Sequence, residues 1–201
     1  MHELAKGRRI FLVRHGQTRQ HDEKMFIGRY DVPLAAGTEK DIAEMAEKLK
    51  EEIHKEEARQ SRLKIYTSPL LRAKQTAEII KEVLGTVETE LCIEENLQEI
   101  SLGEWDGRPV REIKEQYPAE YERRGNDLFA FKTGNRAENF YDVQYRAVKA
   151  LRIILKADSS RDRVIVSHSA VIRALENNLK AMQVDDYWDP VDKCSYRTIE
   201  L

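Results

Sequence analysis

Two histidines that lie just after short apolar runs are the residues of this sequence with the clearest chemical potential. Residues 10–13 are apolar, β-branched or aromatic, and Arg14 and His15 follow them. Residues 163–167 contain a second β-branched apolar run, and His168 follows them. Runs of this length and composition predict buried strands. Open α/β sheets bind their ligands at the carboxyl ends of parallel strands. We therefore expect both imidazoles and the guanidinium to meet at one edge of a sheet.

A second arginine is predicted to face the same edge. Residues 63–67 read as another strand, and Ser68 and Pro69 follow as a good helix N-cap and a good first helical residue. Arg72 then lies in the first turn of this helix, where free N–H groups and the helix dipole favour an anion. Guanidinium groups match phosphate oxygens bidentately. The predicted site suits a tetrahedral oxyanion such as phosphate.

The order of the predicted elements indicates how these residues are positioned. Strands alternate with amphipathic helices, which predicts a three-layer α/β/α sandwich around a mostly parallel central sheet. Thr38 is expected to cap the first helix. Further helices are expected near residues 73–84, 143–154 and 170–179, and further strands near residues 89–93 and 195–201.

Residues 101–136 interrupt this alternation. Glycines and prolines punctuate the segment, and only a short helix near residues 110–117 is predicted within it. We interpret it as a lid-like excursion within one domain that covers residues 1–201. Its aromatic residues and arginines could favour a substrate with a further anionic group, or could be amphipathic packing. They are Trp105, Tyr117, Tyr121, Phe129 and Phe131, with Arg108, Arg111, Arg123, Arg124 and Arg136.

Composition narrows the class of protein. The 201 residues carry 34 Lys and Arg against 36 Asp and Glu, so the net charge of −2 gives no general attraction to nucleic acid or to anionic membranes. No stretch resembles a signal peptide or approaches a membrane span. With only Cys92 and Cys194, neither a disulfide framework nor a zinc site is indicated, and a cytoplasmic location is expected.

Five segments carry a family resemblance. They are residues 12–18 (Leu-Val-Arg-His-Gly-Gln-Thr), 28–37, 66–77, 96–107 and 164–175. In order and spacing they resemble the motifs of the histidine phosphatase superfamily, which contains cofactor-dependent phosphoglycerate mutases and many phosphomonoesterases. The resemblance covers essentially the whole chain and implies a phosphoglycerate mutase-like fold.

The resemblance also implies a role for each residue of the predicted site. His15 would be the nucleophile that accepts the phosphoryl group, while Arg14, Arg72 and His168 would hold its other oxygens. Glu99 would protonate the departing alkoxide and then act as the base for water. No metal or other cofactor is implied, because cationic side chains would do the neutralising.

Further residues are expected around the phosphate or the substrate, and several differ from the family pattern. They are Gln17, Thr18, His21, Gly28 and Ser169. His21 stands where the family usually has Asn, Gln17 where it more often has Glu, and Ser169 where it usually has Gly. Residues 136–139 replace a Gly-Gly-Glu-Ser segment. These differences leave the substrate open.

Three functions remain to be separated. Mutases of the family carry a longer insertion between the positions of Glu99 and His168, one that shields the phosphorylated intermediate from water. The shorter segment here favours hydrolysis of a small phosphorylated metabolite over mutase activity. Binding of a phosphorylated ligand or partner without turnover is the third reading, although binding alone needs neither His15 nor Glu99. A homodimer is compatible with the sequence.

Overall fold

A five-stranded sheet in the order β4-β3-β6-β1-β7 forms the centre of the protein. The computed structural model describes residues 9–19, 24–55, 63–85, 90–134, 136–157, 162–180 and 191–201. The strands are β1 (Arg9–Arg14), β3 (Leu63–Thr67), β4 (Glu90–Ile93), β6 (Asp162–Ser167) and β7 (Ser195–Glu200). The first four strands of this order pair in parallel and β7 pairs antiparallel with β1, which confirms the predicted mostly parallel sheet.

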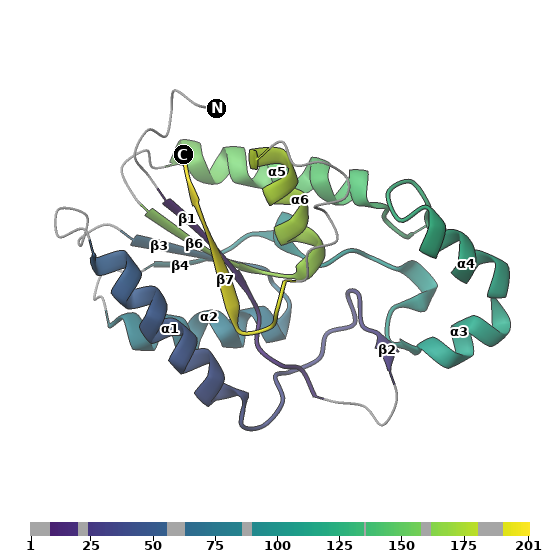
Figure 1. The fold of residues 1–201 in the computed structure, drawn as a ribbon, viewed down its shortest axis with the longest axis horizontal. Helices are drawn as coiled ribbons and strands as arrows, with labels where there is room; N and C mark the ends of the chain where they lie inside the picture. The colour runs from purple at the N-terminus through teal and green to yellow at the C-terminus, as the bar shows by residue number, and fades with distance from the viewer. Residues whose placement is uncertain are drawn as a thin grey trace.

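Helices cover both faces of the sheet (Figure 1). Helices α1 (Thr38–His54) and α2 (Leu71–Leu84) lie on one face, and α5 (Phe140–Ala157) and α6 (Ser169–Lys180) lie on the other. Strand β1 alternates between the two layers, because Ile10 and Leu12 pack with α5 and α6 whereas Phe11 and Val13 pack with α1 and α2. The predicted three-layer arrangement is confirmed.

Strand register brings the functional positions to one edge. Arg14 of β1 pairs with Ser167 of β6, and Thr67 of β3 pairs with Val166. The residues that follow these three strands therefore begin at the same level of the sheet.

Two predicted helix caps are wrong. Helix α1 begins at Thr38 after Gly37, whose φ of 85° is left-handed, and the Thr38 hydroxyl accepts a hydrogen bond from the N–H of Gln17 (3.1 Å). Helix α2 begins at Leu71, two residues later than predicted from Ser68 and Pro69. In both cases a tertiary contact uses the hydroxyl that the local pattern assigns to a cap.

The excursion projects from the end of the sheet where the strands finish (Figure 1). It contains the short helix η4 (Gly103–Trp105), strand β5 (Arg108–Pro109) and helices α3 (Val110–Gln116) and α4 (Pro118–Asn126). Strand β5 pairs antiparallel with β2 (Met25–Phe26), which anchors the excursion to the loop after β1. The glycine and proline pattern does not predict helix α4, because Pro118 lies within the punctuated segment; in the structure it occupies the first turn of α4, where proline fits.

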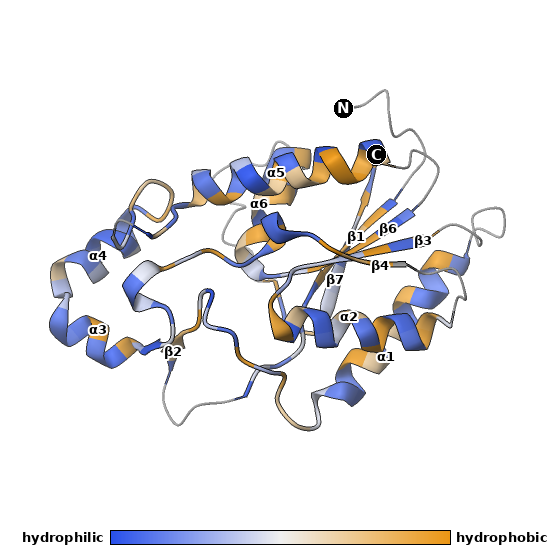
Figure 2. Cartoon of the chain, turned by 180° about the vertical axis from the view of Figure 1, so that it is seen from behind, coloured by the Kyte–Doolittle hydropathy of each residue, from blue (hydrophilic) through white to orange (hydrophobic). Residues whose placement is uncertain are grey.

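Aromatic rings hold the excursion together. Trp105 is only 2% exposed, and its ring lies 5.4 Å from Phe26 and 6.2 Å from Tyr117. Arg108 and Arg124 stack on Tyr117 and Phe26. Much of the arginine and aromatic content is therefore packed within the excursion. In Figure 2 strands of the sheet show hydrophobic stretches beside hydrophilic ends, while α3 and α4 are largely hydrophilic.

Among the residues that the structure describes, no helix combines the length and apolar character needed to cross a bilayer.

Candidate active site

The two predicted histidines lie side by side. The ring centroids of His15 and His168 are 5.0 Å apart, and the two residues are 5% and 0% exposed. Their proximity follows from the β1–β6 register, because each is the residue after a paired strand end, and the N–H of His15 continues the ladder to the carbonyl of Ser167 (3.1 Å). Residues far apart in the chain thus meet in one buried place.

Hydrogen bonds fix the tautomer of His15. Its Nδ1 lies 2.7 Å from the carbonyl oxygen of Gly16, and its Nε2 lies 3.3 Å from Nε of Arg72. A carbonyl only accepts and a guanidinium only donates, so the proton belongs on Nδ1 and the lone pair on Nε2. The ring therefore presents an unprotonated nitrogen to the cationic side chain.

Arg72 is held rigidly beside this nitrogen. The residue is 1% exposed, and its Nη1 and Nη2 donate to the carbonyls of Tyr30 (3.1 Å) and Gly28 (2.8 Å). Gly28 has a φ of 48°, and a Cβ there would come within 1.7 Å of the Asp106 carboxylate. Gly28 thus contributes a backbone carbonyl at a position that requires glycine.

Arg14 and His168 present buried polar atoms that are unsatisfied within the described part of the chain. Arg14 donates from Nη1 to the carbonyl of Val191, but its Nε has no hydrogen-bond partner there. His168 Nε2 lies 2.8 Å from the hydroxyl of Ser68, and its Nδ1 has no such partner. Buried polar groups are almost always hydrogen-bonded, so these two atoms are suited to a polar ligand.

Glu99 reaches the same region from the segment after β4. Its Oε1 accepts hydrogen bonds from the N–H groups of Ile100 (3.0 Å) and Ala170 (3.2 Å), the latter in the first turn of α6. Burial lowers the pKa of both Arg14 and Arg72, and the negative charge of Glu99 acts in the opposite direction on each. The carboxylate therefore lies within the electrostatic reach of both arginines.

The surroundings keep both histidines neutral. Burial is the main cause that holds the pKa of His15 well below 6.5, and the charges of Arg72, Arg14 and Lys193 add to it. Burial likewise lowers the pKa of His168, with His15 and Arg72 as further causes. A neutral imidazole is the form that can act as a nucleophile.

This depression predicts a pH-dependent loss of stability. As the pH falls below 6.5, the unfolded chain takes up protons at His15 and His168 that the folded protein does not bind. Stability should therefore decline by up to about 1.4 kcal/mol per histidine and pH unit, above the range where ordinary carboxyl groups titrate. Urea unfolding between about pH 7 and pH 5 tests this, with ring-nitrogen NMR of the folded protein alongside. A folded-state titration midpoint at or above 6.5 for either ring would contradict it.

The other predicted binding residues are less closely grouped. Thr18 is buried, and its hydroxyl lies 3.5 Å from Nζ of Lys193, whose own pKa is lowered by burial and by Arg14. Ser169 is the first residue of α6, next to His168. His21 lies outside the described residues.

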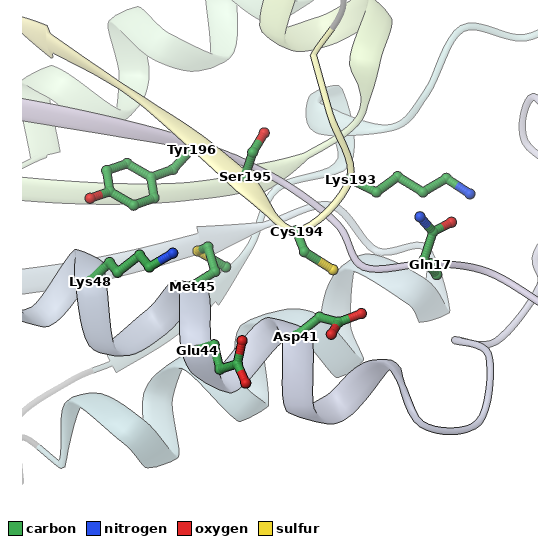
Figure 3. A pocket seen from close by; sticks show the side chains of 9 residues that line it. All are labelled: Gln17, Asp41, Glu44, Met45, Lys48, Lys193, Cys194, Ser195 and Tyr196. Carbon is green, nitrogen blue, oxygen red and sulfur yellow. The ribbon is translucent and has the colours of Figure 1, made fainter.

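Gln17 faces a different hollow. Its side chain is exposed and lines a hollow of about 460 Å³ between α1 and the start of β7, shown in Figure 3. Neither His15 nor His168 lines this hollow. The structure thus does not group the Gln17 side chain with the two imidazoles.

Glu99 lines a separate cavity of about 340 Å³. Its walls include the apolar residues Ile100, Leu128 and Phe140, together with Arg124 of the excursion and Arg173 of α6. Cavities of this size are typical of sites for small ligands. Glu99, the candidate acid, and residues of the excursion therefore line the same cavity.

The sequence pattern missed three contributors to this site. Ser68 read as a helix cap but contacts His168, and Lys193 carried no local signal. Arg146 carried no signal beyond its place in a predicted helix, although it binds the backbone that precedes Glu99. No group of three or more His, Cys, Asp or Glu side chains within the described ranges is arranged to hold a metal ion.

Comparison with known proteins agrees with the resemblance noted from the motifs. Residues 10–201 match the sequence model of the "Histidine phosphatase superfamily (branch 1)". The chain is 28% identical to "Phosphoserine phosphatase 1" of Hydrogenobacter thermophilus over 96% of this chain and 86% of that protein. It is 30% identical to "Uncharacterized phosphatase PhoE" of Bacillus subtilis over 83% and 74% of the two chains.

A solved structure gives the same result. YhfR of Bacillus stearothermophilus superposes with a TM-score of 0.80 and 28% identity, over 97% of this chain and 92% of that chain. The sequence motifs, the α/β sandwich and the match over almost the full length agree with one another. This chain belongs to the histidine phosphatase superfamily, branch 1.

Proposed function

We propose that this protein hydrolyses phosphate monoesters of small metabolites through a phosphohistidine at His15. The observation that carries the proposal is the neutral ring of His15, whose Nε2 lone pair is kept next to Arg72 by the Nδ1 hydrogen bond to the Gly16 carbonyl. A buried imidazole with a fixed tautomer beside buried guanidinium groups suits nucleophilic attack on a phosphoryl group. The phosphatase names of the relatives support the same reaction class.

The cationic groups would bind the three phosphoryl oxygens that do not leave. Arg72 Nε already lies beside Nε2, and Arg14 Nε and His168 Nδ1 are two buried polar atoms that have no hydrogen-bond partner within the described chain. For His168 to donate from Nδ1, the Ser68 hydroxyl must donate to Nε2, and the N–H of Leu70 supports this by donating to the Ser68 oxygen (3.3 Å). Preorganised donors of this kind stabilise charge as it spreads in the transition state.

Glu99 would supply the protons. Attack by Nε2 of His15 forms the N–P bond as the ester P–O bond breaks, and a protonated Glu99 gives its proton to the departing alkoxide. The resulting carboxylate then takes a proton from water, which attacks the phosphorus atom, breaks the N–P bond and releases inorganic phosphate. Removing the alcohol as a neutral species matters because an alkoxide is a poor leaving group.

The cavity next to Glu99 would receive the alcohol part of the substrate. Its apolar walls and its two arginines suit a small organic group that carries a negative charge. We propose that the excursion acts as a lid over this cavity, since Arg124 and Leu128 belong to it. Gln17, Thr18 and Ser169 remain candidates for contacts with the substrate, and Gly28 for one with the phosphate.

Product analysis tests the reaction class. The protein should release inorganic phosphate from a panel of phosphorylated metabolites, and turnover should persist in excess EDTA. With 3-phosphoglycerate and a bisphosphoglycerate primer, free phosphate should exceed the isomerised product. Predominant isomerisation would establish a mutase instead, and tight binding of the panel without turnover or phosphoenzyme would establish a binding protein.

The setting of the protein is part of the same proposal. We expect it to act in the cytoplasm on a small phosphorylated substrate, without nucleic acid or membrane partners, and a homodimer stays a prediction that sedimentation equilibrium can test.

A further inference from the structure

Arg146 of α5 divides its hydrogen bonds between the backbone segment that ends at Glu99 and the carboxylate of Glu138. Its Nη1 donates to the carbonyls of Asn96 and Gln98 (both 2.7 Å), and its Nη2 donates to the carbonyl of Glu99 (3.0 Å). Its Nε and Nη2 also donate to the two carboxylate oxygens of Glu138 (2.8 and 2.9 Å). A guanidinium has five N–H groups, and these five bonds employ every one of them.

Glu138 extends this arrangement to the other side of Glu99. Its carboxylate accepts a hydrogen bond from the N–H of Ser101 (3.0 Å) and forms an ion pair with Arg29 (3.0 Å). Arg29 in turn donates from Nε to the carbonyl of Glu99 (3.0 Å). The carbonyl oxygen of Glu99 thus accepts hydrogen bonds from two guanidinium groups. Two residues later, Glu138 holds the N–H of Ser101.

The carboxyl group of Glu138 keeps its charge although the pair is largely shielded from solvent. The side chains of Arg146 and Glu138 are only 12% and 18% exposed. Burial acts to raise the pKa of Glu138, but the hydrogen bonds and charge of Arg146, together with the N–H of Ser101 and the charge of Arg29, hold that pKa below its ordinary value. Ion pairs that are largely buried often add little net stability to a fold. Because this pair holds the backbone next to Glu99, positioning that backbone explains its presence better than stability does.

We infer that the Arg146–Glu138 pair positions the carboxyl group of Glu99 at the leaving-group oxygen, with Arg146 as the main positioning residue. The inference rests on the proposed function. Oε1 of Glu99 is occupied by the N–H groups of Ile100 and Ala170, so the placement of this carboxyl group depends on the backbone that Arg146 holds. A misplacement of about 1 Å can cost on the order of 100-fold in rate.

The dependence on the leaving group separates positioning from a purely structural role. 4-Nitrophenyl phosphate releases an acidic phenol that departs without a proton, whereas 2-phosphoglycerol releases an alcohol that needs one. In Arg146→Lys the ammonium cannot replace five donors in a plane. We expect its kcat/KM to fall about 10- to 100-fold with 2-phosphoglycerol and less than about threefold with 4-nitrophenyl phosphate, because only the first reaction needs the acid.

Matched variants complete the experiment. Arg152→Lys changes the same residue type at an exposed position of the same helix, and both substrates should be unaffected. Glu138→Gln keeps the side-chain shape but removes its charge, and it should show a smaller loss with the same preference, even if Arg146→Lys does not fold. Equal losses with both substrates, or no loss with either, in the folded variants would overturn the inference.

Glu99→Gln is the benchmark that separates this inference from the proposed function. It should show the strongest preferential loss with 2-phosphoglycerol, about 100-fold or more. If it does and the Arg146 and Glu138 variants do not, only the positioning role fails. If Glu99→Gln shows no preference, the acid role of Glu99 fails and the positioning role fails with it.

Discussion

Replacing His15 by alanine is expected to reduce kcat for phosphate monoesters by about 10⁴- to 10⁶-fold, the scale of loss when an enzyme that works through a covalent intermediate loses its nucleophile. Within the part of the chain that the structure describes, the buried Nε2 of His15 is the ring nitrogen that accepts the hydrogen bond from Arg72. Water alone would have to attack the substrate directly. Steady-state release of inorganic phosphate measures the loss.

Two controls make this result specific. His54→Ala alters a histidine at the end of α1 and should retain the wild-type rate. Circular dichroism and thermal unfolding should show that His15→Ala is folded. A folded His15→Ala that keeps a rate within tenfold of the wild type would mean that another group performs the reaction.

The second large effect is expected for Arg72→Lys, which should lower kcat/KM by about 10³-fold while keeping the positive charge. The guanidinium reaches His15 Nε2, the Tyr30 carbonyl and the Gly28 carbonyl from three different nitrogens. A lysine ammonium has a single nitrogen on a flexible side chain, so it cannot make these three contacts at once. The rates should be compared at substrate concentrations well below KM.

Inhibitor binding shows where the loss in Arg72→Lys arises. Affinity for vanadate, which imitates the transferring phosphoryl group, should fall together with kcat/KM, because the arginine acts mainly in the transition state. Arg152→Lys should leave both quantities unchanged. A folded Arg72→Lys variant within fivefold of the wild type would show that charge alone suffices at this position.

The sequence allowed the core of the site to be predicted because its parts are adjacent to strong local signals. Arg14, His15 and His168 each follow a buried run, and parallel strands place such positions at one edge. The β1–β6 register makes the two histidines neighbours. Arg72 could be assigned to the first turn of α2 even though the predicted start of that helix was two residues early.

The remaining features depend on contacts that local patterns do not encode. The hydroxyls of Thr38 and Ser68 resemble caps, but Gln17 and His168 compete for them in the folded chain. In the helical pattern Arg146 cannot be told apart from any other polar residue. Its contacts exist only because the segment before Glu99 lies next to it in the folded chain. Tertiary competition of this kind overrides local propensity.

The packing of the excursion likewise could not be predicted from local sequence patterns. Strand β2 is two residues long; it pairs with β5, and its Phe26 packs against the ring of Trp105. No period in the sequence marks so short a strand. The cavity at Glu99 likewise arises only when Arg124 and Leu128 of the excursion meet Arg173 of α6.

Trapping the phosphorylated enzyme is the most direct test of the central claim. Wild-type protein that is denatured with detergent at alkaline pH, after brief exposure to a ³²P-labelled phosphate monoester, should carry a base-stable and acid-labile label on the peptide that contains His15, and His15→Ala should carry none. The label should leave the wild-type protein as inorganic phosphate when unlabelled substrate is added. Turnover without any labelled histidine, or label on a different residue, would contradict the mechanism.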